Sequence, residues 1–86
     1  MLIRASELGM LDVVNVVDGR RLGNVYDVDI DLETGRVRAL LLPRGSGFWS
    51  RRPDLTIPWE RITLIGADVI LVDLPDQAEP PPWARR

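Results

Sequence analysis

The sequence has 86 residues, with 13 acidic against 11 basic side chains and no histidine, cysteine or lysine. These absences exclude a Ser-His or Cys-His nucleophile, a Schiff-base lysine and a metal site built from imidazole or thiolate ligands. Carboxylates remain, but carboxylate catalysis needs a cleft that raises one pKa, and one small domain encloses little volume. We therefore expect a protein that is not an enzyme and that binds neither a cofactor nor a metal.

Charge and hydropathy limit the partners. The net charge is −2 and the isoelectric point is about 4.9, which disfavours nucleic acid and anionic lipid as ligands. No apolar run approaches the roughly 18 residues that cross a bilayer, and the N-terminus lacks the long apolar region of a signal peptide. The expectation is a cytoplasmic protein without membrane insertion.

The first third of the chain predicts one helical turn followed by strands. Residues 2–10 accommodate a single turn of helix that Gly9 ends. The Val-rich segment 12–17 predicts a strand, and Asp18-Gly19 is the dipeptide that most favours a tight hairpin turn. In residues 26–31, apolar side chains alternate with aspartates at a strand's period of two, so we expect one buried face and one acidic face.

The turn at residues 32–35 is predicted to be a four-residue loop because opposite charges then pair across the hairpin. In that register Asp31 faces Arg36 and Asp29 faces Arg38, all on the outer face. A three-residue loop would instead place Arg38 opposite an isoleucine.

Leu40 and Leu42 continue the face that carries Arg36 and Arg38. Under that register the outer face of the strand turns apolar toward Pro43. The sequence therefore predicts that another surface covers this end of the strand.

The second half predicts short strands and an extended tail. A loop rich in glycine and proline over residues 44–54 precedes strands over residues 55–57, 62–65 and 68–74. Residues 76–86 contain three consecutive prolines and Trp83, a composition typical of a polyproline-type arm. We expect one domain over residues 1–75 and a proline-rich C-terminal tail over residues 76–86.

Five or six short strands with tight turns and almost no helix predict an all-β fold. The expected architecture is a small antiparallel β-barrel, closed or partly closed, because closure removes the exposed edges that a flat sheet of this size would carry.

Three groups of residues resemble the PRC-barrel family: Leu22-Gly23, Asp31-Leu32-Glu33-Thr34-Gly35, and Ile57-Pro58-Trp59 followed by Ile62, Ile65-Gly66, Asp68 and Ile70. The resemblance covers residues 2–74 and is greatest to small stand-alone proteins of the YlmC/YmxH type, which are associated with sporulating bacteria. It implies a barrel of about six strands, related to the C-terminal domain of the ribosome maturation factor RimM and to the cytoplasmic part of the photosynthetic reaction centre H subunit. It also implies an adaptor that binds protein or ribonucleoprotein assemblies, with no catalytic residue in the motif.

The acidic run that begins at Asp27 has the opening spacing of a calcium loop. In such a loop the sixth residue is Gly and the twelfth is Glu, whereas here these positions hold Leu32 and Arg38. The run is therefore interpreted as a solvated strand face.

The loop from Arg44 to Arg52 is the strongest candidate for function. It places Phe48 and Trp49 between glycines and an arginine pair, and Trp and Arg are enriched at binding hot spots and suit stacked bases. Either these aromatics form a partner surface, or Trp49 folds back as a lid over the barrel mouth. The full set of predicted partner-binding residues is Arg44, Phe48, Trp49, Arg51, Arg52, Leu40, Leu42 and Trp83.

Two functions fit these features. The first is a non-enzymatic protein-interaction or adaptor module that is sporulation-related and homo-oligomeric, with a dimer favoured. It is supported by the apolar strand faces, which carry more apolar surface than one barrel interior can bury. The second is an RNA- or ribosome-associated module that uses the loop from Arg44 to Arg52, and the acidic isoelectric point counts against it. The residues do not identify the protein partner.

Overall fold

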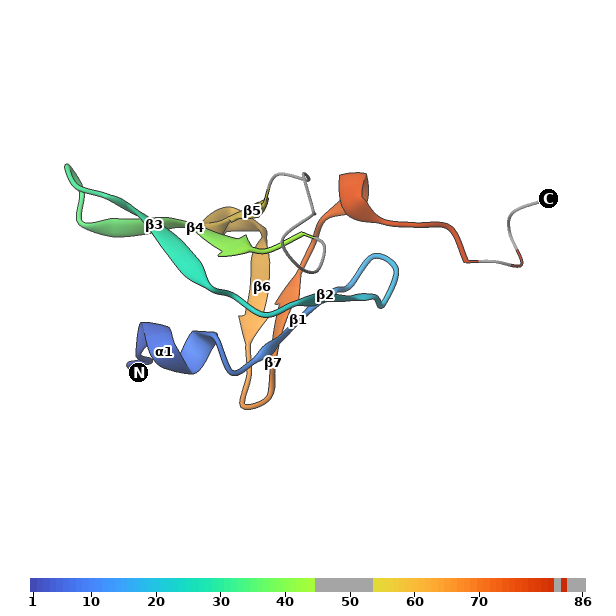
Figure 1. Ribbon diagram of the computed structural model, residues 1–86, viewed down its shortest axis with the longest axis horizontal. Coiled ribbons are helices and arrows are strands. Elements are labelled where there is room, and N and C mark those ends of the chain that lie inside the picture. The colour runs from blue at the N-terminus through green and yellow to red at the C-terminus, as the bar shows by residue number, and fades with distance from the viewer. Residues whose placement is uncertain (45–53, 82, 84–86) are drawn as a thin grey trace.

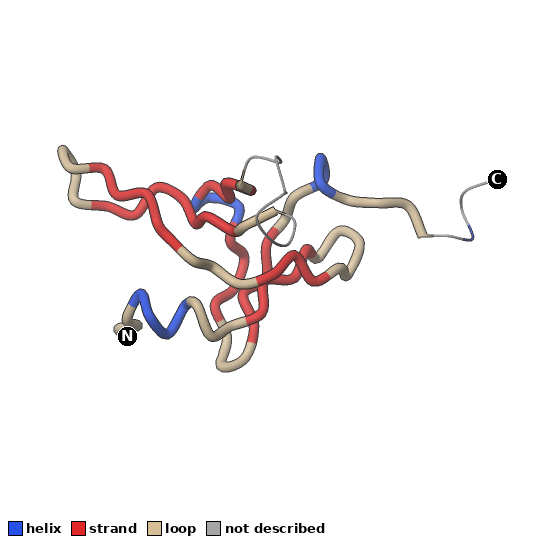
Figure 2. The backbone as a smooth tube through the Cα atoms, in the orientation of Figure 1, coloured by secondary structure: helices blue, strands red, loops and turns tan. Residues whose placement is uncertain are grey.

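The computed structural model describes residues 1–44, 54–81 and 83, and most of their regular elements are strands (Figures 1 and 2). The confirmed fold class is all-β, with a single turn of α-helix. In chain order the elements are α1 (Ala5–Leu8), β1 (Asp12–Asn15), β2 (Arg21–Gly23), β3 (Asp27–Asp31), β4 (Arg36–Leu42), β5 (Leu55–Pro58), the 3-10 turn η1 (Trp59–Arg61), β6 (Ile62–Ile65), β7 (Val69–Val72) and the 3-10 turn η2 (Pro75–Gln77).

The described strands form two sheets, and these are not closed into one barrel. Sheet A has the order β2-β1-β7-β6 and sheet B the order β3-β4-β5. All neighbouring strands are antiparallel except β1 and β7, which are parallel. This parallel pair departs from the antiparallel barrel expected from the sequence. Parallel neighbours need a long connection between them, and here that connection includes the whole of sheet B.

The hydrophobic core lies between the two sheets. Sheet A contributes Val13, Ile70 and Val72 and sheet B contributes Leu40, Leu42 and Ile57, all with no exposed surface. Burying one such side chain contributes about 1.5–3 kcal/mol relative to leaving it exposed. The cluster is completed by Leu8, Leu11, Val25, Leu55 and Leu74.

The β3–β4 hairpin confirms the predicted four-residue turn. Asp31 lies opposite Arg36 and Ile30 opposite Val37. Gly35 has a φ of 71°, a conformation that favours glycine, and its N–H donates to the Asp31 carbonyl at 2.7 Å. The hairpin projects from the body of the molecule at the side opposite residues 78–81 (Figure 1).

A β-bulge then shifts the register, so the expected pair of Asp29 and Arg38 is wrong. Asp29 lies opposite Ala39, and Arg38 is the extra residue of the bulge. The Arg38 guanidinium turns back to Asp31 instead and donates from Nε and Nη2 to Oδ2 at 3.0 and 2.8 Å. A bulge gives one strand two residues where its partner has one.

The bulge also corrects the positions of Leu40 and Leu42. An extra residue moves every later side chain of the strand to the other face. Both leucines therefore face the core and have no exposed surface, and the outer face at this end of the strand is formed by Ala39 and Leu41 instead.

Candidate interaction surfaces

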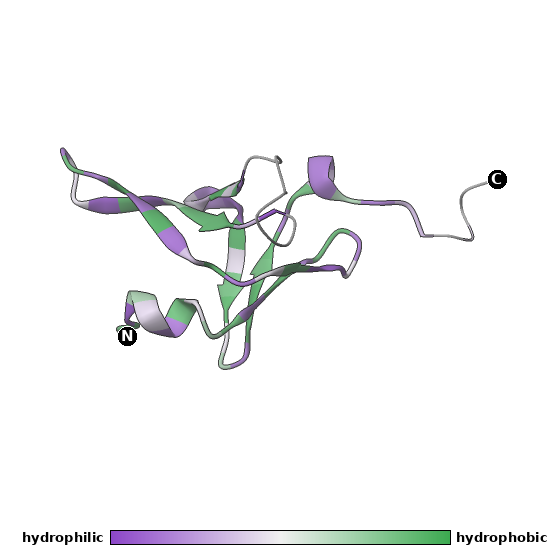
Figure 3. Ribbon diagram, in the orientation of Figure 1, coloured by the Kyte–Doolittle hydropathy of each residue, from purple (hydrophilic) through white to green (hydrophobic). Residues whose placement is uncertain are grey.

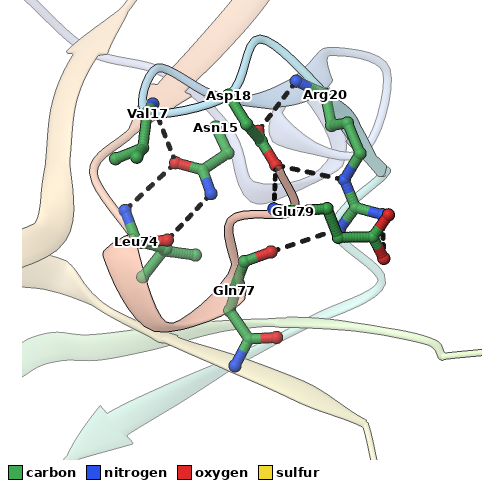
Figure 4. Close-up of polar contacts among 7 residues, drawn as sticks. All are labelled: Asn15, Val17, Asp18, Arg20, Leu74, Gln77 and Glu79. Atoms are coloured by element: carbon green, nitrogen blue, oxygen red, sulfur yellow. Dashed lines mark hydrogen bonds and ion pairs between the residues drawn. The ribbon is translucent and has the colours of Figure 1, made fainter. Parts of the chain in front are cut away.

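A buried asparagine joins the end of β1 to the segment that follows β7. The Asn15 side chain has no exposed surface, and its Nδ2 donates to the Leu74 carbonyl at 2.9 Å (Figure 4). Its Oδ1 accepts from the N–H groups of Leu74 at 3.1 Å and Val17 at 3.2 Å. One side chain thus satisfies both backbone groups of Leu74 and starts the turn between β1 and β2.

Residues 74–79, which we call the C-terminal strap, are held against the same turn by charged groups (Figure 4). Asp18 accepts from the Glu79 N–H at 2.9 Å, and Arg20 contacts Asp18 at 3.3 Å and Glu79 at 2.9 Å. Arg20 also donates to the Gln77 carbonyl at 3.3 Å. Hydrogen bonds from the N–H groups of Arg20 and Glu79, and then the Arg20 charge, lower the pKa of Asp18. The expected tail therefore begins with residues that are attached to the domain.

A polar groove of about 420 Å³ lies between the strap and β2. The guanidinium groups that line this groove belong to Arg20, Arg21 and Arg44. Arg21 binds Asp12 at 2.8 Å, and Arg44 donates to the Gln77 side chain at 2.8 Å. Because Arg20 and Arg21 are in ion pairs and Asp76 and Glu79 also line the groove, most of its positive charge is compensated.

The outer face of sheet A is apolar. Val14 of β1, Leu71 of β7 and Leu64 of β6 are register partners and lie in one row across three strands. They point away from the core, because alternate positions of β1 and β7 are the fully buried ones. Leu64 is 53% exposed, and Val69 lies on the same face of β7. Figure 3 shows that β7 is hydrophobic along its length. We call Val14, Leu64 and Leu71 the outer row.

An apolar outer row is unusual for a sheet with one covered face. Such sheets normally alternate apolar side chains toward the core with polar side chains toward water. Residues 69–72 are all apolar, which by itself gives β7 two apolar faces. The contributions of Val14 and Leu64 were missed, since only the register across strands aligns them with Leu71.

A second groove, of about 250 Å³, lies between α1 and the start of β3. It is lined by Ala5, Ser6, Gly9, Val25, Tyr26, Asp27 and Val28, and we call it the Tyr26 groove. A Cβ atom at Gly9 would lie 3.0 Å from the Val25 carbonyl oxygen, so glycine allows the end of α1 to approach this close. No local sequence pattern predicts this groove, because its two walls come from separate elements.

The predicted partner-binding residues have several different outcomes. Leu40 and Leu42 are core residues, Arg44 lines the polar groove and Trp83 is 76% exposed. Phe48, Trp49, Arg51 and Arg52 lie outside the described residues. The choice between a partner surface and a lid for the two aromatics therefore stays a prediction.

The described part of the chain offers no cluster of three metal-ligating side chains. Among the same residues, no helix is long and apolar enough to cross a membrane.

The fold and these surfaces are those of a small β-domain, and the chain belongs to the PRC-barrel domain family, whose model matches residues 1–78. It is 43% identical over 76 residues to the probable sporulation protein YlmC of Bacillus subtilis, covering 85% of this chain and 94% of YlmC. It is 33% identical over 82 residues to the uncharacterized protein YmxH of the same organism, covering 91% of this chain and 96% of YmxH. An uncharacterized protein of Clostridium acetobutylicum is 37% identical over 65 residues, 73% of this chain and 75% of that protein.

Proposed function

We propose that this chain is a non-enzymatic interaction module that self-associates through the outer face of sheet A and presents its remaining surfaces to a protein partner. The observation that supports this is the row of three apolar side chains across β1, β7 and β6. Contiguous apolar surface that faces water is uncommon on a protein that functions as a monomer.

A second copy of the chain is the occupant that fits this face. The outer row is uncharged, and it is flanked at β2 by the ion pair of Arg21 and Asp12. Two copies related by a twofold axis would place apolar row against apolar row. The flanking pair carries both signs of charge, so its two copies can meet without net repulsion.

The similarity to YlmC supports a role in sporulation, because that relative is named a probable sporulation protein. A sequence without histidine, cysteine or lysine supports a non-enzymatic role. The absence of cysteine also fits a reducing compartment, so a cytoplasmic location is part of the proposal.

The test is sedimentation equilibrium of the full chain with two matched substitutions. Leu64→Glu places a charge in the outer row, whereas Ile30→Glu places the same charge on an equally exposed strand residue of the projecting hairpin, 55% against 53% exposed. We expect Leu64→Glu to weaken self-association at least about tenfold, since truncating or charging a buried interface anchor commonly costs that much or more. Ile30→Glu should leave association unchanged. A wild-type chain that stays monomeric at millimolar concentration, or equal effects of the two substitutions, would contradict the proposal.

The alternative is a module that binds RNA or the ribosome through the loop from Arg44 to Arg52. The arginines of the polar groove support it only weakly, because Arg20 and Arg21 are already in ion pairs. Sedimentation with and without total RNA at two salt concentrations distinguishes the two functions. An RNA complex loses affinity steeply as salt increases, whereas an apolar self-contact changes little.

A further inference from the structure

The Tyr26 groove is lined by Asp27, and Asp29 lies on the same face of β3 next to the lining residue Val28. Asp27 and Asp29 enter none of the ion pairs among the described residues, in contrast to Asp31, which Arg38 holds. The Tyr26 ring is 55% exposed and its hydroxyl donates to the Asp54 carboxylate. That hydrogen bond, partial burial, and the negative charges of Asp54, Asp27 and Asp29 raise the pKa of Tyr26. The groove thus combines an aromatic wall with an electronegative rim.

The C-terminal end of the same chain has the complementary chemistry. Ala78 has φ −72° and ψ 139°, which is polyproline II backbone, and three prolines follow Glu79. Trp83 is exposed, and beyond Glu79 the only charged residues are Arg85 and Arg86. We call residues 79–86 the C-terminal arm.

The base of the arm, at Glu79, is attached to the turn between β1 and β2. Asp18 accepts the Glu79 N–H at 2.9 Å and Arg20 binds the Glu79 carboxylate at 2.9 Å. Residues 78–81 lie at the end of the molecule opposite α1 and the hairpin of β3 and β4 (Figure 1). The described start of the arm therefore lies away from the Tyr26 groove of its own chain.

We propose that the Tyr26 groove of one copy binds the C-terminal arm of a second copy. Proline-rich segments bind grooves lined by aromatic side chains, because a polyproline helix is already ordered and loses little entropy on binding. The prolines and Trp83 pack against Tyr26, and the two terminal arginines lie near Asp27 and Asp29. This contact rests on the proposed self-association and adds a second interface to it. It uses no residue of the outer row.

The first test is a titration of the isotope-labelled full chain with a synthetic peptide of residues 79–86, followed by NMR. The chain carries Trp83→Ala, so that its own arm competes less. We expect saturable shifts of the amide signals of residues 5–9 and 25–28. A peptide with the same Trp83→Ala change is the matched control and should bind at least about tenfold more weakly, as expected for loss of an aromatic anchor. Shifts confined to other parts of the chain, or no shifts at several millimolar peptide, would overturn the proposal.

The second test exchanges the charges. Asp27→Arg combined with Asp29→Arg should weaken peptide binding about three- to tenfold, the range for two exposed ion pairs. A peptide in which both arginines are replaced by aspartate should regain that affinity with this variant and lose it with the parent chain. Glu33→Arg combined with Asp68→Arg changes the net charge equally at acids outside the groove and should leave binding unchanged. Equal effects of the two double variants would overturn the proposed site.

The two proposals can fail separately. Leu64→Glu should abolish the contact through sheet A and leave peptide binding intact, because Leu64 lies outside the Tyr26 groove. If the peptide binds nowhere while Leu64→Glu still disrupts association, only the arm contact is wrong. If the peptide binds the groove and Leu64→Glu has no effect on association, only the sheet contact is wrong.

Discussion

The hairpin of β3 and β4 and the centre of sheet A are stabilised in different ways. The hairpin pairs residues that are close in sequence, and its outer half is exposed and held by a turn and an ion pair. The centre of sheet A pairs β1 with β7, and the Asn15 side chain reaches Leu74, 59 positions away in the sequence, in a fully buried environment. The hairpin therefore depends on local geometry, whereas the fold as a whole depends on contacts between the two ends of the chain.

The largest expected effect comes from one substitution made in both regions. Ile70→Ala removes a fully buried side chain from β7 and should lower the free energy of unfolding by about 2–5 kcal/mol, through lost burial and the cavity that remains. Ile30→Ala in β3 removes the same atoms from a half-exposed position and should cost about 0.5 kcal/mol or less. Urea denaturation of both variants gives the two values. Similar losses at the two positions would mean that the hairpin belongs to the same core.

A somewhat smaller effect is expected at the buried asparagine. Asn15→Ala leaves the buried N–H and carbonyl of Leu74 without their partner and should destabilise the fold by about 2–4 kcal/mol. Asn24→Ala is the control, because Asn24 donates to the Leu11 carbonyl at 2.8 Å from a partly buried site and should cost about 1 kcal/mol. Urea denaturation again measures both. Equal costs would show that water replaces the Asn15 hydrogen bonds.

The smallest effect concerns the ion pair of the hairpin. A double-mutant cycle of Asp31→Asn with Arg38→Gln should give a favourable coupling, seen as a shift of about 1–3 °C in melting temperature. The asparagine keeps an oxygen for the Glu33 N–H, so the cycle isolates the charge contact. The same cycle with Asp29→Asn should give no coupling, because the bulge separates Asp29 from Arg38. Coupling at Asp29 instead would restore the register without a bulge.

The coupling should also depend on pH. Hydrogen bonds from Arg38 and from the Glu33 N–H hold the pKa of Asp31 below its usual value. A lowered pKa in the folded state stabilises the fold above the unfolded pKa of about 3.9, and this contribution is lost as pH falls through the folded pKa. The coupling should therefore be constant between about pH 6 and 8, where no histidine titrates, and disappear in acid.

Local patterns predicted the all-β class, the hairpin turn at residues 32–35 and the short helical turn. The bulge at Arg38 could not be predicted, because charge pairing at the turn fits either register and only the burial of Leu40 and Leu42 requires the shift. The parallel pairing of β1 with β7 has no local signal either. It depends on how sheet B and β6 return the chain to sheet A, where β7 lies beside β1.

The candidate surfaces were predictable to a lesser degree. The proline-rich composition identified the C-terminal arm and Trp83, and the apolar run in β7 indicated a second apolar face. The outer row requires the register of three strands, and the Tyr26 groove requires α1 to lie beside β3. No local sequence pattern predicts either of these relations between elements.

The parallel pair of β1 and β7 has a consequence for synthesis of the chain. Sheet A has β1 and β7 at its centre, so β1 lacks one neighbour and β6 lacks its only one until the final strand has left the ribosome. The hairpin of β3 and β4 can form earlier, but the side of the core that Ile70 and Val72 supply is still missing. Folding that must close so long a loop is slow compared with the formation of local hairpins. Until β7 is available, Leu40, Leu42 and Ile57 therefore lack their partners from sheet A, and we expect a truncation before residue 69 to leave them exposed to aggregation or proteolysis.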